Sequence, residues 1–450
     1  MDRNGAADGN GAVMTRRDFV RAAGTAAAGA WLLGGRLVNP VHAAGSDELK
    51  VGLIGCGKRG TGAAEQALST KGPVKLWAVG DAFADRIEDC LGYLTGESPA
   101  AKRVDVPPER RFAGLDAYRK VVDSGVDVVI LCQPPGFRPL HFEYAVENGK
   151  HVFMEKPVAT DAPGIRRILA AGEAAKRKNL KVAVGLQRRY DPGYQETVRW
   201  IRDGAVGDVV LMRAYWDCER AAKVPPPRKG FTELQYQVRN WYYFTWLSGD
   251  HIAEQHVHNL DVCNWVKGGH PVEAQGQGGR QVRTGKEYGN IFDHHVVEFT
   301  YADGTKLFSQ CRQIPGVWNQ VAEHVRGVKG RADVGKHLIE AAGGEPWRYA
   351  GAHGKREAGG DPYQIEHDVL FVAIRNDTPH SDVEHAATAT MTAILGRMAT
   401  HSGQLVKWDD AFKSELSLAT EALSWDATPK DLPDAEGRYA VPVPGVTKVL

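Results

Sequence analysis

The sequence predicts a two-domain α/β chain, in which a parallel sheet with crossover helices precedes an α+β domain built on a large, mainly antiparallel open sheet. Between residues 46 and 187, apolar runs alternate with helical patterns, as the parallel sheet requires. Beyond residue 187, stretches rich in Val, Ile, Phe and Tyr alternate apolar with polar positions, which is typical of antiparallel strands. The 450 residues are enough for two separate cores. We therefore expect domains at 46–187 and 188–450, after a leader at 1–45.

Apolar runs, caps and turns locate the expected elements. Strands of the first sheet are expected at 49–54, 74–79, 126–131, 151–153 and 181–185. A helix should begin after Asp161, which can cap it, because Pro163 stands in the first turn and cations stand at 176–178. In the second domain we expect strands at 209–215, 296–301 and 305–311, with a hairpin turn at 302–304. Runs rich in Pro and Gly at 225–227 and 343–362 predict surface insertions.

The composition favours small molecules as partners. The net charge is +1 and both signs are interleaved, so no long-range field favours nucleic acid. The six cysteines show neither a C-x-x-C pair nor a metal-binding spacing. We interpret them as free, with a disulfide as the alternative in an oxidising compartment.

The first 45 residues resemble a twin-arginine export leader. Arg16 and Arg17 precede an apolar, Ala-rich run at 22–33, and Val41-His42-Ala43 offers small residues for cleavage. This run is shorter than the roughly 20 residues that a membrane-spanning helix needs, so we expect no stable membrane insertion. The prediction is a periplasmic protein. The alternatives are a protein anchored by its uncleaved leader and an ordinary N-terminal helix with a chance pair of arginines.

A glycine-rich loop follows the first predicted strand. Gly55-Cys56-Gly57-Lys58-Arg59-Gly60 matches G-x-G-x-x-G between a strand and a helix, and Asp81 ends the second strand about twenty residues later. This pattern predicts a Rossmann dinucleotide site. An acid at position 81 bonds ribose hydroxyls and repels a 2′-phosphate, so NAD is favoured. Lys58 and Arg59 can contact a phosphate and keep NADP as the alternative. An exported enzyme finds no nucleotide pool outside the cytoplasm, so the cofactor should be tightly bound.

A second cluster of polar residues lies further along the first sheet. It comprises Gln133 and Pro134, then His141, and then Glu155-Lys156-Pro157 after the strand at 151–153. Ligands of open α/β folds bind at the carboxyl ends of the strands, so Lys156 is expected at that edge. We treat all of these as cofactor-site candidates. The alternative for Lys156 is a simple ion pair with a core acid.

These motifs together resemble the Gfo/Idh/MocA family of oxidoreductases, which includes glucose-fructose oxidoreductase and inositol dehydrogenases. The likeness rests on the glycine loop, on Asp81, on the run from Gly149 to Pro157 and on Gln187-Arg188-Arg189-Tyr190-Asp191-Pro192 at the domain junction. The resemblance implies an NAD(P)-dependent oxidoreductase with Gln187 at the cofactor and Arg188 at the substrate. It also implies a homodimer or homotetramer.

In that family an Asp stands four residues before a His, near the start of a helix in the second domain. The matching residues are Glu254 and His258, which share a helix face, whereas His256 points away. The resemblance therefore implies Lys156, His258 and Glu254 as catalytic residues, and either Lys156 or His258 can take the hydroxyl proton. Glu in place of Asp is a departure from the family pattern. Without the resemblance, His258 reads as a packed core histidine and Glu254 as a carboxylate near a helix N-terminus.

Trp241, Tyr242 and Asn259 complete the candidate substrate residues, with Arg188. Aromatic faces stack on sugar rings, although an aromatic run such as 241–246 is equally typical of a core or a subunit interface. No metal site is expected, because the histidines at 251, 256, 258, 294 and 295 lack a recognised zinc-binding spacing.

Three functions follow as expectations. The first is an oxidoreductase that moves a hydride between the nicotinamide and a secondary hydroxyl of a sugar, a sugar derivative or a cyclic polyol. The second is a redox-neutral, NAD-dependent glycosidase, in which oxidation, elimination and reduction cleave a glycosidic bond. The third is a non-catalytic sugar-binding protein, against which the intact Gly55, Gly57, Asp81, Lys156 and His258 argue.

Overall fold

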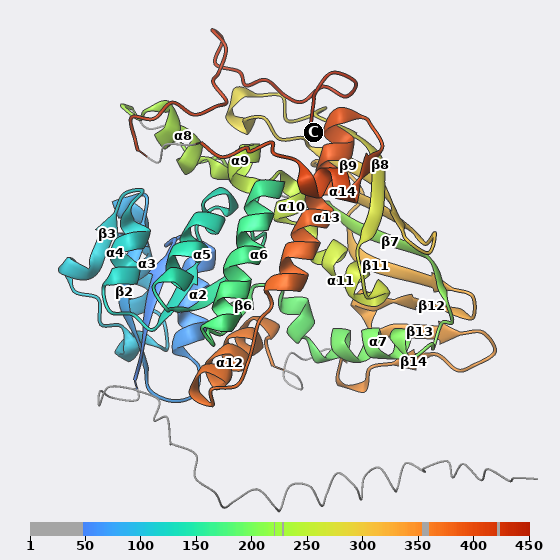
Figure 1. Ribbon diagram of the computed structural model, residues 1–450, viewed down its shortest axis with the longest axis horizontal. Coiled ribbons are helices and arrows are strands. Elements are labelled where there is room, and N and C mark those ends of the chain that lie inside the picture. The colour runs from blue at the N-terminus through green and yellow to red at the C-terminus, as the bar shows by residue number, and fades with distance from the viewer. Residues whose placement is uncertain (1–47, 220, 227–228, 353–359, 421–423) are drawn as a thin grey trace, which may run out of the picture. The chain divides into compact units, whose positions relative to one another are not determined.

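Two sheets organise the protein in the computed structural model, which describes residues 48–219, 221–226, 229–352, 360–420 and 424–450. The predicted leader lies outside these residues. The first sheet has the strand order β3-β2-β1-β4-β5-β6, and the second has the order β14-β13-β12-β11-β7-β10-β9-β8-β15 (Figure 1). An order of 3-2-1-4-5-6 is that of a dinucleotide-binding Rossmann sheet. The predicted fold class is therefore confirmed.

The first sheet is parallel throughout. Its strands are β1 (Leu49–Ile54), β2 (Val74–Asp81), β3 (Arg111–Ala113), β4 (Val128–Leu131), β5 (His151–Met154) and β6 (Val182–Val184). The five expected strands are all present. The edge strand β3 was not predicted, because three residues with two exposed side chains carry no readable hydrophobic period.

The helices of the first domain are α2 (Lys58–Leu68), α3 (Ala84–Gly96), α4 (Ala117–Asp123), α5 (Arg138–Glu147) and α6 (Ala162–Arg177). The expected cap of α6 is confirmed, since the Asp161 carboxylate accepts the N–H of Gly164 at 2.8 Å. Helix α6 buries Ile165 and Ile168 in the hydrophobic core.

The second sheet is mainly antiparallel, as expected. Its strands are β7 (Val209–Cys218), β8 (Pro271–Gly279), β9 (His294–Tyr301), β10 (Lys306–Gln313), β11 (Gln320–Gly327), β12 (Gly330–Asp333), β13 (Leu338–Ala341), β14 (Trp347–Arg348) and β15 (Val406–Lys407). The predicted hairpin joins β9 to β10, where the N–H of Tyr301 bonds the carbonyl of Thr305. One pair, β7 with β10, is parallel.

The remaining helices are α7 (Pro192–Arg202), α8 (Glu233–Arg239), α9 (Thr245–Ser248), α10 (His251–Glu254), α11 (Val257–Lys267), α12 (Pro362–Arg375), α13 (Val383–Ser402) and α14 (Trp408–Lys413). Helix α13 packs against both α6 and β8, so it stands between the two sheets (Figure 1). Helix α12 packs on α2, and its Leu370 and Phe371 join the apolar core of the first sheet. Late segments of the chain thus complete the N-terminal domain.

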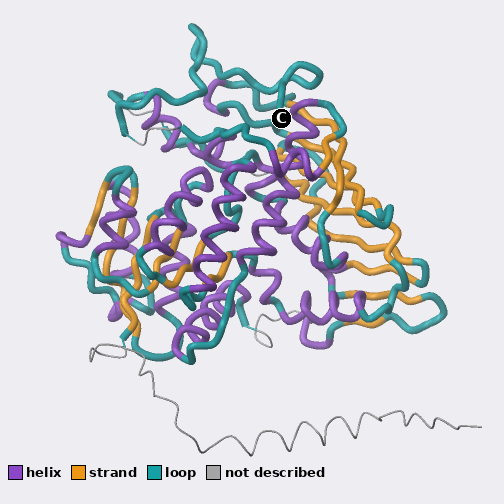
Figure 2. The backbone as a smooth tube through the Cα atoms, in the orientation of Figure 1, coloured by secondary structure: helices purple, strands orange, loops and turns teal. Residues whose placement is uncertain are grey.

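The last described residues, 424–450, contain neither helix nor strand and run as a loop over the molecule (Figure 2). Tyr439 anchors this tail, because its ring packs on Phe244 with centroids 4.8 Å apart and its hydroxyl donates to Glu233 at 2.6 Å. No disulfide joins any of the six cysteines, all of which lie in the described residues, as expected. In the part of the chain that the structure describes, no helix combines the length and apolar character needed to cross a membrane.

Candidate active site

The glycine loop forms a tight turn between β1 and α2. Gly55 has φ +96°, and a Cβ there would lie 2.5 Å from the Cys132 carbonyl carbon. A Cβ on Gly60 would lie 1.8 Å from the Gly55 carbonyl oxygen. Gly57 differs, since a Cβ there would meet no atom within 4 Å. The first and third glycines therefore serve packing, and the second faces open space where a pyrophosphate would approach the helix N-terminus.

A cavity of about 590 Å³ opens at this loop. The first domain lines it with Gly55, Gly57, Lys58, Arg59, Gly60, Asp81, Phe83, Gln133, Pro134 and His141, among others. The second domain closes it with Ala222, Lys223, Pro225, Pro226, Val238, Arg239 and Trp241. Arg239 also holds Asp85 of α3 through two ion-pair contacts at 2.6 and 3.0 Å. Pro225 and Pro226 belong to the run at 225–227 that was expected as a surface insertion, and they form part of the cavity wall.

Asp81 stands at the end of β2 inside this cavity. Its carboxylate accepts the N–H of Cys56 at 2.7 Å and the N–H of Phe83 at 3.0 Å. These bonds fix the carboxylate beside the glycine loop, where an acid would receive ribose hydroxyls and repel a 2′-phosphate. Cys56 therefore contributes its backbone, while its thiol is buried against the Gly80 carbonyl.

Two polar side chains of the cavity lack partners among the described residues. Neither the amide nitrogen nor the amide oxygen of Gln133 makes a hydrogen bond, and Nδ1 of His141 makes none. Both side chains are buried. Burial, together with the positive Arg138, lowers the pKa of His141 to about 3, and Tyr118 stacks on its ring at 4.0 Å. Buried polar groups are normally satisfied, so these orphaned atoms and the open Gly57 fit a bound dinucleotide.

The Arg59 guanidinium is engaged by other side chains of the protein rather than left free for a phosphate. It donates to Glu155 at 2.5 Å and to Gln66 at 2.8 Å, and it lies 3.9 Å from the carboxylate of Glu366 on α12. Glu155 is thereby tied to the glycine loop. Lys58, by contrast, is exposed at the cavity, where it can contact a phosphate.

Lys156 joins the two domains at the end of β5. Its ammonium donates to the backbone carbonyl of Glu254 at 2.5 Å and to the Glu254 carboxylate at 3.2 Å. The single helix expected through 254–258 is instead two, α10 and α11, with a turn at Gln255–His256. In an unbroken helix the Glu254 carbonyl would accept the N–H of His258. Lys156 occupies that carbonyl, and the N–H of His258 bonds the Gln255 carbonyl instead.

His258 lies in the first turn of α11 and interacts electrostatically with Lys156. Burial, with the positive charges of Lys156 and Arg188, holds the pKa of His258 well below its usual range. Its ring stacks on Trp216 at 6.0 Å, and its Nδ1 has no hydrogen-bond partner in the described residues. His256 is turned away, as expected, and bonds Ser309 of the second sheet at 2.7 Å. The structure therefore places one neutral imidazole next to one ammonium group.

A second cavity, of about 780 Å³, lies beside Trp216. Its lining includes Tyr242, Gln255, Gln313 and Asn319, and Ala222 lines both this cavity and the first. Aromatic rings with amide side chains form surfaces that bind sugars and polyols. Gln255 and Gln313 were not singled out from the sequence, since isolated glutamines carry no motif.

Several predicted site residues line neither cavity, among them Lys156, Glu254 and His258 and also Gln187, Arg188 and Asn259. Asn259 is fully buried and donates to Glu323 at 2.5 Å. Arg188 forms a buried ion pair with the same Glu323, and Gln187 donates to the Tyr363 hydroxyl at 3.0 Å. The amide nitrogens of Asn259 and Gln187 and the Arg188 guanidinium are therefore used inside the protein, whereas the two amide oxygens have no partner among the described residues. Arg188 acts on His258 through its charge. Trp241 lines the first cavity and Tyr242 the second.

This chain is similar to several solved structures and sequence relatives, and their names are related to one another. The fold is similar to that of a levoglucosan dehydrogenase solved with NADH and levoglucosan, with a TM-score of 0.63, 16% identity, and coverage of 80% of this chain and 99% of that one. It is also similar to a scyllo-inositol dehydrogenase of Lactobacillus casei solved with NAD(H) and scyllo-inositol, with a TM-score of 0.60, 20% identity, and coverage of 80% and 99%.

Two sequence relatives are an inositol 2-dehydrogenase of Paracoccus denitrificans, 34% identical over 48% of this chain and 54% of its own length, and inositol 2-dehydrogenase 4 of Saccharopolyspora erythraea, 31% identical over 49% and 54%. The chain thus spans about half the length of these characterised relatives.

Two family descriptions match the domains separately. Residues 49–186 match "Oxidoreductase family, NAD-binding Rossmann fold", and residues 194–333 match "GFO/IDH/MocA C-terminal domain". Together these matches cover more than half of the chain, and they meet at the junction between the two sheets. The chain belongs to the Gfo/Idh/MocA family of oxidoreductases.

Proposed function

We propose that this protein is an NAD-dependent oxidoreductase that acts on a secondary hydroxyl of a sugar, a sugar derivative or a cyclic polyol. The observation that carries the proposal is the contact of Lys156 with Glu254, which brings the ammonium group to the segment that carries His258, whose neutral imidazole interacts with that charge. The names of the inositol 2-dehydrogenase relatives support this substrate class.

NAD, when bound, supplies a hydride acceptor, and the residues of this chain manage the proton and the alignment. His258 is uncharged, so it can accept the proton of the substrate hydroxyl. Lys156 is held by Glu254 and can donate a hydrogen bond to the same oxygen. Trp216 holds the imidazole by stacking. Glu254 therefore acts by positioning Lys156.

The proposal is tested by releasing and identifying the nucleotide from the purified protein and then adding inositols, sugars and glycosides. Net formation of a ketone with reduction of the bound NAD is expected. Release of a free aglycone without a net ketone would instead indicate the redox-neutral glycosidase. Absence of both nucleotide and turnover would indicate a binding protein and contradict the proposal.

The pH dependence of turnover should report His258. Because burial and the nearby cations hold its pKa well below the usual range, the imidazole should stay unprotonated as the pH falls through 6.5. We expect kcat/KM to remain level there and to decline only at lower pH, as His258 gains its proton. The measurement is a pH–rate profile at saturating NAD. An acidic limb centred at or above pH 6.5 would exclude His258 as the base.

We further propose export through the twin-arginine route, with the cofactor carried inside. The support is the sequence at 14–43 together with the cavity that both domains enclose, which favours tight binding. Changing Arg16 and Arg17 to lysine should retain the protein in the cytoplasm, as fractionation would show. Equal export of the variant would refute this route, and the N-terminal mass of the exported protein distinguishes a cleaved from an uncleaved leader.

We also propose a homodimer or homotetramer formed through the open second sheet. Val296 on β9 and Phe308 on β10 belong to one face of that sheet and are 46% and 41% exposed. Apolar side chains on an open sheet face favour burial against a second copy. Light scattering of the purified protein measures the mass, and a monomer at micromolar concentration would contradict the proposal.

A further inference from the structure

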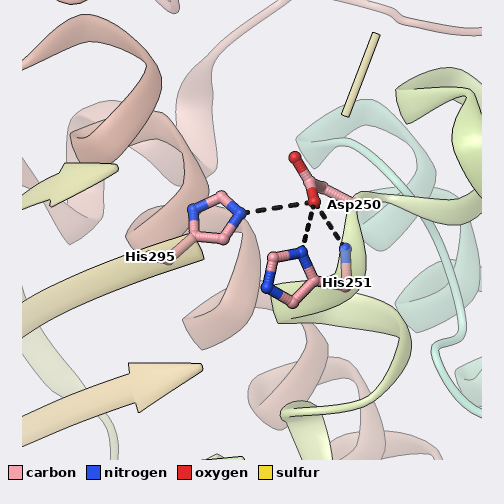
Figure 3. Close-up of side chains that lie close together, drawn as sticks. All are labelled: Asp250, His251 and His295. Atoms are coloured by element: carbon pink, nitrogen blue, oxygen red, sulfur yellow. Dashed lines mark hydrogen bonds and ion pairs between the residues drawn. The ribbon is translucent and has the colours of Figure 1, made fainter. Parts of the chain in front are cut away.

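Asp250, His251 and His295 form a compact, buried group at the start of α10 (Figure 3). Asp250 and His251 begin α10, and His295 comes from β9 of the second sheet. None of the three side chains is more than 1% exposed. Their ligand atoms lie within 4.8 Å of one another. Residues distant in the sequence thus converge on one point.

The outer nitrogen of each imidazole has a hydrogen-bond partner in the protein. Nε2 of His251 faces the carbonyl of Cys311 at 3.4 Å, and a carbonyl can only accept. Nδ1 of His295 lies 2.9 Å from the hydroxyl of Thr400, which donates its own proton to the Arg397 carbonyl at 3.0 Å. The outer nitrogen of His295 therefore carries the ring proton and its inner nitrogen carries a lone pair, whereas His251 has an acceptor on both sides, because its Nδ1 lies 3.0 Å from a carboxylate oxygen of Asp250.

These inner nitrogens both face the same carboxylate oxygen. Nδ1 of His251 lies 3.0 Å and Nε2 of His295 lies 3.3 Å from Oδ1 of Asp250 (Figure 3). Nε2 of His295 makes no hydrogen bond within the described residues. The side chains of His251 and His295 thus converge on one oxygen, which also accepts the backbone N–H of His251 at 2.6 Å, and the lone pair of His295 Nε2 faces that oxygen without a proton between them.

A divalent metal ion resolves this arrangement. Imidazole nitrogens and a carboxylate oxygen are ligands that zinc prefers, and ligating histidines commonly donate their other N–H to a carbonyl or another oxygen. The other carboxylate oxygen is already engaged, because it accepts the N–H of Phe292 at 2.9 Å and lies 3.2 Å from His401. We propose that Asp250, His251 and His295 bind a divalent transition-metal ion such as Zn²⁺.

The ion would have a structural role. It would join the first residues of α10 to β9, and the last residue of α10 is Glu254, which holds Lys156. Asp250 adopts φ +70° and ψ 162°, a conformation that residues other than glycine rarely hold. A metal bond to its carboxylate would stabilise this backbone. The sequence did not predict the site, because its ligands come from α10 and a strand of the second sheet.

The test is elemental analysis of untagged, full-length protein after incubation with Zn²⁺ and exhaustive dialysis. We expect about one zinc ion per chain. The variant His295→Gln should lose at least about 90% of it, whereas the matched control His294→Gln should keep it. His294 is the neighbouring residue, and its ring bonds Asp293 instead. Zinc far below one ion per chain in the wild type, or equal zinc in His295→Gln, would overturn the proposal.

A second measurement needs no variant and so does not depend on whether His295→Gln folds. Wild-type protein stripped with a chelator and loaded with Co²⁺ should show visible d–d absorption bands of a site with nitrogen and oxygen ligands. Adding Zn²⁺ should abolish those bands and raise the melting temperature, while Mg²⁺ should do neither. A Co²⁺ spectrum identical to that of the ion in buffer would refute the site.

Discussion

Replacing Lys156 with alanine is expected to lower kcat by about 10³-fold while NAD stays bound. The side chain ends between the Glu254 carbonyl and the Glu254 carboxylate, so its loss removes the ammonium group beside His258. The glycine loop and Asp81 make no contact with this ammonium, so the dinucleotide should be retained. Single-turnover kinetics and quantification of the released nucleotide measure the two effects separately.

Lys150→Ala is the matched control for this prediction. Lys150 precedes the same strand at its opposite end, where its ammonium donates to the Val126 carbonyl at 2.8 Å. Its removal should leave kcat within about twofold, since a surface substitution usually has a small effect. Turnover by Lys156→Ala at the wild-type rate would remove Lys156 from the mechanism, and loss of bound NAD in that variant would show that it supports the cofactor instead.

Two glycines of one loop should respond to alanine in opposite ways. Gly60→Ala places a Cβ 1.8 Å from the Gly55 carbonyl, so the turn must shift, and we expect the free energy of unfolding to fall by about 1–3 kcal/mol. Gly57 has φ −72° and no neighbour within 4 Å, so Gly57→Ala should leave stability almost unchanged. Its methyl group would instead occupy the space of the pyrophosphate and weaken NAD binding by about tenfold or more.

Denaturant unfolding of the nucleotide-free protein and calorimetric titration with NAD distinguish these effects. Each variant serves as the control for the other, because both add one methyl group to the same loop. Equal NAD affinity in Gly57→Ala and wild type would mean that the dinucleotide does not pass over this glycine. An unchanged free energy of unfolding in Gly60→Ala would mean that the loop adapts without cost.

Local patterns predicted the first domain well. The strand before Gly55, the helix after it and Asp81 at the end of β2 lie close together in the sequence, so their chemistry can be read there. Arg59 is a residue whose contacts the local sequence did not predict. Its position in the loop suggested a phosphate contact, but Glu155 and Glu366 come from distant segments and attract the guanidinium.

The pairing of Glu254 was also beyond local reasoning. Helical spacing joined it to His258, whereas the structure joins it to Lys156, 98 residues earlier in the chain. That contact depends on how the two domains pack. Packing also ends α10 at Glu254, because Lys156 takes the carbonyl that would have continued the helix. The unpaired amide of Gln133 and the part of the cavity wall that the second domain supplies also depend on how distant segments pack, so local reasoning did not predict them.

The contribution of α12 to the first core has a consequence for biosynthesis. Leu370 and Phe371 fill the interior of a sheet whose strands all emerge from the ribosome before residue 190. The amino-terminal half therefore has to wait with uncovered apolar surface until nearly the whole polypeptide has been translated. This half therefore completes its core late in synthesis, and a chaperone that shields nascent chains would be needed longest there.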